Sequence, residues 1–285
     1  MKTVIYFTEN QIDRLLEDDV PMGDLTTFLM EMSGQKAKIT LLARNPMIVC
    51  CTEEAVRLYK KLNLQITSFV SSGTQVKTGD KILEAQGDAA SVHSIWRTST
   101  ALIEFASGIS DRTKQLVTEA RKENPGVTVA GTRKHPPYIK KIALKALMAG
   151  GGIPHRTGLS DTILIFREHL LFAGGYEKLS EIVSKIKKKQ KERKIVVEAH
   201  TEDQAISITN SGADAVQLDK MSPENFAACV QKCKRLNPDI SMIAAGKIND
   251  SNAGAYTKAG AEILVSSWMY FAQPADVKAE IVPIV

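Results

Sequence analysis

The second half of the chain repeats one pattern, in which a short apolar run is followed by a longer amphipathic stretch. In the stretch 176–194, Leu179, Ile182, Val183 and Ile186 recur at helical spacing. Continuous apolar strands that alternate with helices are typical of a parallel sheet covered by helices. The pattern predicts an α/β fold, and the strand count favours a closed, TIM-like α/β barrel over an open doubly wound sheet. The apolar runs lie at 127–132, 162–166, 195–199, 215–219, 241–246 and 262–267.

The first half of the chain has a different pattern. Apolar residues between 36 and 90 are broken by glycine-containing turns at Ser72-Gly73, Thr78-Gly79-Asp80 and Gly87-Asp88. Short strands joined by tight turns produce this pattern. From Ser91 onward the pattern becomes helical. These features predict a first domain of mixed strands and helices.

Composition narrows the class of protein. Of the 285 residues, 44% are hydrophobic and 24% charged, which is ordinary for a globular enzyme. The net charge of +5 is too mild to indicate nucleic-acid binding and is compatible with small anionic substrates. No apolar run is long enough to span a bilayer, and the N-terminus turns polar too early for a secretory signal. We therefore expect a cytoplasmic protein with no membrane partner.

Two further features invite other functions but are better explained by ordinary structure. The basic run 185–194 lacks interleaved aromatic residues, so a solvated helix face is favoured over a nucleic-acid site. The four cysteines lack the spacing of a second metal-binding pair, and we expect them to be buried in a reducing compartment. They are Cys50, Cys51, Cys229 and Cys233.

Charged and small residues gather where the predicted strands end. Active sites of α/β barrels lie at these carboxyl ends, and cations, two carboxylates and small-residue turns together suit a polyanionic substrate held with a divalent metal. Glu198 or Asp219 alone could equally form a structural ion pair, and Gly150 to Gly152 could merely end the preceding helix, so the prediction depends on the convergence of these residues. The residues are Thr132-Arg133-Lys134-His135, Gly150 to Arg156, Glu198, His200, Asp219-Lys220, Gly246-Lys247 and Ser266-Ser267.

Six segments, in order, make the chain resemble the quinolinate phosphoribosyltransferase family over nearly its whole length. They are GDLTT (23–27), SGIS (107–110), TRK (132–134), GGGIPHRTGLSD (150–161), VEA (197–199) and QLD (217–219). GGGIPHRTGLSD is the specific one, and TRK alone would be weak. The resemblance implies an N-terminal α+β sandwich domain, placed at 1–110, and a C-terminal α/β barrel, placed at 111–270. The tail 270–285 is expected to pack back on the first domain.

The resemblance also implies an activity and its residues. The family transfers phosphoribose from phosphoribosyl pyrophosphate (PRPP) to quinolinate with Mg²⁺, loses CO₂ and forms nicotinate mononucleotide for NAD biosynthesis. It works as a dimer or an assembly of dimers. The matching positions are Arg97, which would reach the neighbouring subunit's site, Arg133 and Lys134 of TRK, His155 and Arg156 for acceptor carboxylates, Glu198 and Asp219 near ribose and metal, and Gly246 in the phosphate loop. Lys247, Ser266 and Ser267 are expected at the same phosphate end, and Lys134 is expected to join Glu198 and Asp219 in catalysis.

Four departures from the family pattern concern the acceptor and the phosphate loop. Phe166 and Leu144 stand where the family has lysines, and Lys247 and Ser267 stand where it has glycines. An apolar side chain beside a dianion leaves a carboxylate unpaired, so quinolinate should bind poorly. These departures resemble the ModD branch, which is associated with molybdate-transport genes. We expect an anionic nitrogen heterocycle as acceptor, with quinolinate as only one possibility.

Two alternatives stay open at this point. A barrel lysine, Lys134 or Lys247, could act as a Schiff-base nucleophile, although its TRK context makes this less favoured. The chain could also be a non-catalytic ligand-binding or molybdate-linked accessory protein on the same scaffold, because fold does not fix function.

Overall fold

The computed structural model describes residues 5–284, which form two compact units. The first unit contains the chain up to Lys114 together with Pro136–Gly151 and the segment from Tyr270 onward. The second unit contains Gln115–His135 and Gly152–Met269. Residues 1–4 of the predicted first domain and Val285 of the predicted tail lie outside the described residues. The domain boundary at residue 110 stays a prediction.

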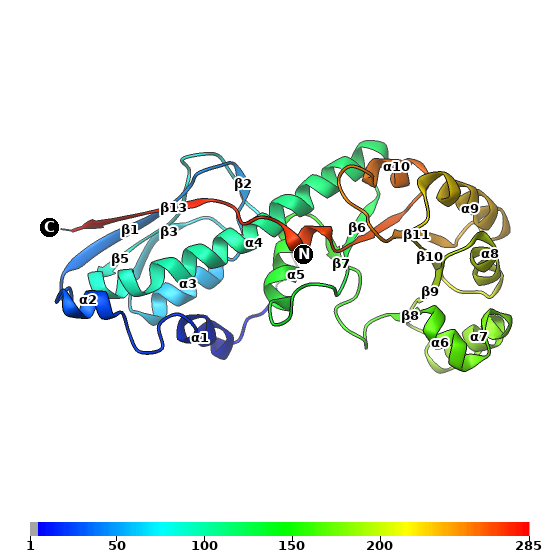
Figure 1. Cartoon of the computed structure of the whole chain (residues 1–285), viewed down its shortest axis with the longest axis horizontal. Helices are drawn as coiled ribbons and strands as arrows, with labels where there is room; N and C mark the ends of the chain where they lie inside the picture. Colours follow the sequence, from blue (N-terminus) through cyan, green and yellow to red (C-terminus); the bar gives the residue numbers. More distant parts are fainter. Residues whose placement is uncertain (1–4, 285) are drawn as a thin grey trace. The chain divides into compact units, whose positions relative to one another are not determined.

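An antiparallel sheet of four strands organises the first unit. Its order is β13 (Val277–Pro283), β1 (Lys36–Ala43), β5 (Lys81–Asp88) and β3 (Gln65–Phe69). Red β13 lies beside blue β1 in Figure 1, so segments from opposite ends of the chain form one ladder. Ile39 and Leu41 on β1 are fully buried, and period-two alternation places both on one face of the sheet.

Helices and a small second sheet complete the first unit. Helix α3 (Thr52–Lys61) contacts β3 and β5. The two-residue strands β2 (Met47–Ile48) and β4 (Gln75–Val76) pair with each other, and β1 takes β5 and β13 as its partners. The remaining α-helices with residues in this unit are α1 (Glu9–Glu17), α2 (Leu25–Leu29), α5 (Lys140–Ala149) and α4 (Ala89–Glu123), which continues into the second unit.

The second unit is built on seven parallel strands, as the alternating pattern predicts. The six apolar runs all form strands. The seventh strand, β7 at one edge, has only two residues and was not predicted, because so short a segment shows no periodicity. The order is β7 (Ile153–Pro154), β6 (Thr128–Gly131), β12 (Ile263–Ser266), β11 (Ser241–Ala245), β10 (Ala215–Asp219), β9 (Ile195–Ala199) and β8 (Ile163–Ile165).

The sheet curves but does not close. In the described part of the chain no ladder joins β7 to β8, so the sheet is a seven-stranded half-barrel. The α/β class is therefore confirmed, and the expectation of a closed ring is wrong. A closed barrel of this kind needs eight strands with a consistent stagger, whereas both edge strands here are only two or three residues long.

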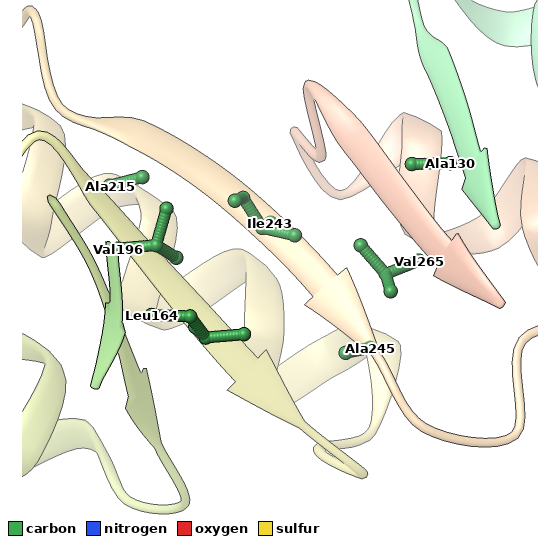
Figure 2. Close-up of a cluster of buried hydrophobic side chains, with 7 residues drawn as sticks. All are labelled: Ala130, Leu164, Val196, Ala215, Ile243, Ala245 and Val265. Atoms are coloured by element: carbon green, nitrogen blue, oxygen red, sulfur yellow. The ribbon is translucent and has the colours of Figure 1, made fainter. Parts of the chain in front are cut away.

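The concave side of the half-barrel holds a core of small and branched side chains. Figure 2 shows the buried cluster Ala130, Leu164, Val196, Ala215, Ile243, Ala245 and Val265, and Phe166 and Ile263 pack against it. Pairing in register, Leu164 with Val196 and Val196 with Ala215, keeps these side chains in common layers. The residues two positions further along each strand therefore face the same interior.

Helices flank the half-barrel on its outer side (Figure 1). On α7 (Leu179–Lys189), Leu179 and Val183 are buried and the lysines are exposed or half-exposed, so the basic run forms a solvated face as predicted. Helix α9 (Pro223–Leu236) begins with Ser222 as its N-cap and proline at its first position. The others are α6 (Arg167–Ala173), η1 (Tyr176–Lys178), α8 (Glu202–Asn210), α10 (Ala253–Lys258) and η2 (Trp268–Phe271).

The cysteines and the helices were also examined for metal-binding and membrane-spanning features. The four cysteines are buried and unpaired, and no cluster of three or more His, Cys, Asp or Glu side chains in residues 5–284 could hold a metal. Across the same residues, no helix combines the length and the apolarity needed to cross a membrane.

Candidate active site

A cavity of about 650 Å³ opens at the carboxyl ends of the half-barrel strands. It collects most of the predicted site residues of the second unit, which come from six different strands or the turns that follow them; His135 and His200 do not line it. Arg97 lies on α4 in the first unit and is exposed; its role stays a prediction. The predicted residues that line the cavity are Arg133, Lys134, His155, Arg156, Glu198, Asp219, Gly246, Lys247, Ser266 and Ser267.

Two carboxylates lie on neighbouring strands at the floor of this cavity. Burial raises the pKa of Glu198, and the negative charge of Asp219 raises it further. Glu198 Oε2 accepts a hydrogen bond of 3.0 Å from Gln217 Nε2, and its Oε1 lies 3.4 Å from His200 Nε2. Asp219 Oδ2 lies 3.6 Å from Lys220 Nζ. The mutual repulsion of the two carboxylates would be relieved by a cation.

The carboxylate pair fits Mg²⁺ in one particular way. Mg²⁺ is usually held by one or two protein carboxylates, with phosphate and water oxygens completing the octahedron. Glu198 and Asp219 supply that number, and no group of three or more His, Cys, Asp or Glu side chains among the described residues could hold a metal by itself. The donor set therefore fits a metal that arrives with a phosphate ligand, and does not fit a closed all-protein cage.

The cations of the cavity outnumber its carboxylates. Arg133, Lys134, Arg156 and Lys247 line it without an ion pair to any residue between 5 and 284. Burial lowers the pKa of Arg156, and the charge of Arg133 lowers it further, so the two guanidinium groups lie close enough to repel each other. Unpaired cations in a shared cavity indicate a polyanionic ligand.

His155 differs from these cations. Burial lowers the pKa of its imidazole, and the neighbouring Arg156 lowers it further. Its backbone N–H donates to the Gly131 carbonyl at 2.9 Å, which fixes β7 against β6. At neutral pH the ring is therefore neutral, and it can offer a hydrogen bond but no charge.

A tight turn after β11 shapes the opposite side of the cavity. Gly246 has a φ of +84°, and Lys247 also lies in the left-handed region. A Cβ at Gly246 would lie 2.6 Å from Asp219 Oδ1 and 2.8 Å from the backbone nitrogen of Lys220. Only glycine fits at this position. The absence of a side chain also leaves the backbone of the turn open to close approach by a phosphate.

The two serines after β12 differ in availability. Ser266 is buried, and its hydroxyl donates to the Ile248 carbonyl at 2.6 Å and accepts from the Trp268 backbone N–H at 3.0 Å. Its side chain therefore holds the loop in place. Ser267 is half-exposed and lines the cavity, which makes it the better candidate for contact with a phosphate.

An aromatic ring lies under one of the guanidinium groups. The Arg156 Cζ lies 5.7 Å from the centroid of Phe166, and His169 stacks on the same ring with its centroid at 5.7 Å and an interplanar angle of 20°. The Phe166 N–H also donates to His169 Nδ1 at 2.9 Å. The end of β8 thus orients a cation through its aromatic face and adds no charge of its own. Leu144 is buried on α5 in the first unit.

Sequence reasoning gave no role to several cavity residues. Gln217 is the clearest case, because it is the one polar residue inside the apolar run AVQLD before the terminal aspartate. Period-two alternation places it on the same face as Asp219, so that pattern carried the signal. The other cavity residues without a predicted role include Leu164, Ile248, Asn249, Val265 and Trp268.

Comparison with known proteins agrees with this geometry. The sequence profile of the quinolinate phosphoribosyl transferase C-terminal domain matches residues 109–280, and that of the N-terminal domain matches residues 24–107. The protein provisionally named pyrophosphorylase ModD of Rhodobacter capsulatus is 38% identical over 248 residues, which are 86% of this chain and 94% of the relative. The protein of the same name from Escherichia coli O157:H7 is 33% identical over 280 residues, which are 98% of this chain and 99% of the relative.

A solved structure extends the likeness to three dimensions. The nicotinate-nucleotide pyrophosphorylase from Francisella tularensis superposes with a TM-score of 0.88 at 25% identity, over 99% of this chain and 100% of that one. The matches run through both units and include the strands that carry the cavity. The chain belongs to the quinolinate phosphoribosyl transferase family.

Proposed function

We propose that this protein transfers the phosphoribosyl group of PRPP to an anionic nitrogen heterocycle and releases pyrophosphate. The observation that supports this most is the surplus of unpaired cations around two carboxylates in one cavity. PRPP carries a 5′-phosphate and a pyrophosphate, so it needs cations at two places and a metal between them. A pocket for a neutral substrate would leave these charges without partners when the substrate covers them, which is costly.

Each group of residues has a separate role in the proposed reaction. The Gly246 turn and Ser267 receive the 5′-phosphate, and Arg133 with Lys134 receives the pyrophosphate. Glu198 and Asp219 would hold Mg²⁺, which when bound neutralises charge on the departing pyrophosphate. As the bond to pyrophosphate breaks, the ribose carbon gains positive charge, and Glu198 stabilises it. Lys134 stays beside the leaving group to balance its negative charge.

The acceptor side supports a substrate other than quinolinate. Arg156 and the neutral His155 can orient one carboxylate of a heterocycle and bring its ring nitrogen to the ribose carbon. The β8 side offers Leu164 and Phe166, which cannot pair with a second carboxylate. A buried carboxylate without a partner is costly, so we propose an acceptor with fewer negative charges than a pyridine dicarboxylate.

The first test follows the reaction directly. We would incubate the protein with PRPP, Mg²⁺ and quinolinate, and quantify pyrophosphate and nicotinate mononucleotide by mass spectrometry. We expect little product but clear thermal stabilisation by PRPP with Mg²⁺. Robust product would contradict the proposed acceptor and leave phosphoribosyl transfer standing. The absence of both product and stabilisation would contradict the donor site and favour a non-catalytic binding protein.

Substitution of Phe166 tests the acceptor side by itself. Phe166→Lys should raise turnover of quinolinate at least about tenfold, because it restores a partner for the second carboxylate, worth about 1.4 kcal/mol or more. Phe172→Lys is the matched control, since Phe172 lies on α6 and is 95% exposed. If both variants leave quinolinate turnover at the wild-type level, Phe166 does not exclude quinolinate.

We also propose a homodimer, or an assembly of dimers, in which Arg97 completes the neighbour's cavity. Arg97 is exposed and has no ion pair in residues 5–284; its guanidinium lies 6.0 Å from the Trp96 ring centroid. Arg97→Ala and Glu198→Gln should each lower turnover about 100-fold. If the two residues act across subunits, mixing the variants should restore part of the activity. Failure of the mixture to recover under subunit exchange would place Arg97 outside the partner's site.

A further inference from the structure

Lys220 differs from the other lysine and arginine side chains of the cavity because it already has a carboxylate partner. Its Nζ lies 3.6 Å from Asp219 Oδ2, whereas the others form no ion pair within residues 5–284. The Lys220 side chain is 66% exposed. An ion pair this exposed is weak and exchanges its partners readily. The ammonium group can therefore leave Asp219 without disturbing the fold.

The backbone brings Lys220 to this place. Its φ of +57° lies in the left-handed region, which few residues other than glycine adopt. Its N–H donates to the Ala245 carbonyl at 2.8 Å, which joins the turn after β10 to the end of β11. Its Cγ would lie 2.5 Å from a Cβ on Gly246. The stem of Lys220 thus lies against the Gly246 turn, while its ammonium group lies near Asp219.

The ammonium group lies where Asp219 needs a positive charge. Asp219 and Glu198 repel each other across neighbouring strands. A bare carboxylate beside the Gly246 turn would also repel an incoming phosphate. Lys220 offsets part of that negative charge while no metal is bound. A divalent metal on Asp219 would in turn repel the ammonium group, so that the two cations compete for one carboxylate.

We propose that Lys220 is a replaceable counter-cation of Asp219, which balances this carboxylate until Mg²⁺ binds and then yields its place. The proposal rests on the proposed function, because it concerns the order in which that site takes its metal and its donor. It has two consequences. PRPP can bind before the metal, and the loss of Lys220 makes donor binding depend on Mg²⁺.

Lys247 provides a matched control for Lys220. It lines the same cavity and has a φ of +58°, but it forms no ion pair in the described part of the chain. Lys220→Asn and Lys247→Asn therefore remove the same charge from the same backbone conformation, which asparagine tolerates. Only Lys220→Asn removes the partner of Asp219.

The first measurement is PRPP binding by calorimetry, with Mg²⁺ and with EDTA. Compared with the wild type, Lys220→Asn should bind PRPP at least about tenfold more weakly in EDTA and within about twofold in Mg²⁺. Lys247→Asn should weaken binding by a similar factor in both conditions. If Lys220→Asn weakens binding equally in both, Lys220 is an ordinary phosphate contact and the proposal is wrong, while the donor site stands.

The second measurement is Mn²⁺ binding without any donor, followed by electron paramagnetic resonance. Lys220→Asn should bind Mn²⁺ at least about threefold more tightly than the wild type, because the competing charge is gone. Lys247→Asn should change the affinity less. Equal Mn²⁺ affinity in Lys220→Asn and the wild type would show that Lys220 does not compete with the metal. If PRPP binds the wild type in neither condition, the proposed function fails, and Mn²⁺ binding decides the competition by itself.

Discussion

Gly246 shows how one residue can be required for conformation and for chemistry at once. Its φ of +84° is unfavourable for any residue with a Cβ. Its missing Cβ also leaves room for the Asp219 carboxylate and the Lys220 backbone. Gly212 has a φ of +81° as well, but nothing lies within 4 Å of the position of its missing Cβ. The two glycines therefore allow backbone strain to be separated from displacement of the site.

Gly212→Ala should lower stability by about 1 kcal/mol, because it places alanine in the left-handed region, and Gly246→Ala should lower it by more, because its Cβ also meets Asp219 and the Lys220 backbone. Only Gly246→Ala should also lower PRPP-dependent turnover, by at least about tenfold, because its Cβ would displace Asp219. Thermal melting and pyrophosphate release measure the two effects. Equal turnover in the two variants would show that Asp219 can shift without loss and would weaken its assigned role.

At the residue scale, the sequence predicted where charged side chains lie better than it predicted which groups form hydrogen bonds with each other. Arg133, Lys134 and Lys247 lie at the cavity rim because they follow strand ends, which the apolar runs locate well. The hydroxyl of Ser266 could not be assigned, because its partners Ile248 and Trp268 become neighbours only through the loop geometry. The unsatisfied Oε1 of Gln217 could not be found either, since a lack of partners is visible only in three dimensions.

At the scale of elements, one half-buried lysine joins helices that are distant in sequence. Lys145 on α5 places its Nζ 2.8 Å from Glu53 Oε2 and 2.5 Å from Glu54 Oε2, both in the first turn of α3. Burial by itself would raise the pKa of Glu53, but hydrogen bonds from Lys145 and Ser72 outweigh it and lower the pKa to about 2. The side chain of Glu54 is only 6% exposed, so it depends on Lys145 for its counter-charge.

Lys145→Met should lower the free energy of unfolding by about 3 kcal/mol at pH 7, because Glu54 is left buried and unpaired. A carboxyl whose pKa is lowered on folding stabilises above its unfolded value near 4.5 and loses that contribution as the pH falls toward 2. The difference between wild type and variant should therefore shrink between pH 5 and pH 2. Urea unfolding at several pH values measures this.

Lys140→Met is the control for Lys145→Met, because Lys140 lies on the same helix and is exposed. It should change stability by less than about 0.5 kcal/mol. A constant difference between Lys145→Met and the wild type across the acid range would mean that lost packing, and not the ion pairs, accounts for the effect.

Elements long enough to show a periodic pattern of apolar residues were predictable from the sequence. Elements that form only by pairing with a distant segment were not. The six apolar runs of the second unit became six strands because each is buried by helices that the same segment of sequence supplies. Strand β7 has two residues, which is too few for any period, and it exists because Ile153 pairs with Ala130. The number of strands alone could not tell a half-barrel from a closed barrel.

At the scale of the whole molecule, the first unit is assembled from segments that are far apart in sequence. Strand β13 pairs with β1 along its length, from Ala37 with Pro283 to Ala43 with Val277. The Glu104 side chain and carbonyl of α4 accept from the Val277 and Ala275 backbone N–H groups. Loop closure over such a separation is slow and entropically costly. The sheet is therefore complete only when the last strand has been added.

A chain that ends after Pro274 should keep its second unit folded and lose part of its first sheet. In an interior antiparallel strand, alternate N–H groups point to the two neighbours. Amide exchange, followed residue by residue, should therefore speed up at every second position of β1 (Lys36–Ala43), by at least about tenfold, while the positions that face β5 keep more protection. A chain that ends after Pro283 retains the ladder and should exchange as the full chain does. If β1 stays fully protected in the shorter chain, another segment must replace β13. If all of β1 loses protection together, β13 is required for the whole four-stranded sheet and not only for its edge.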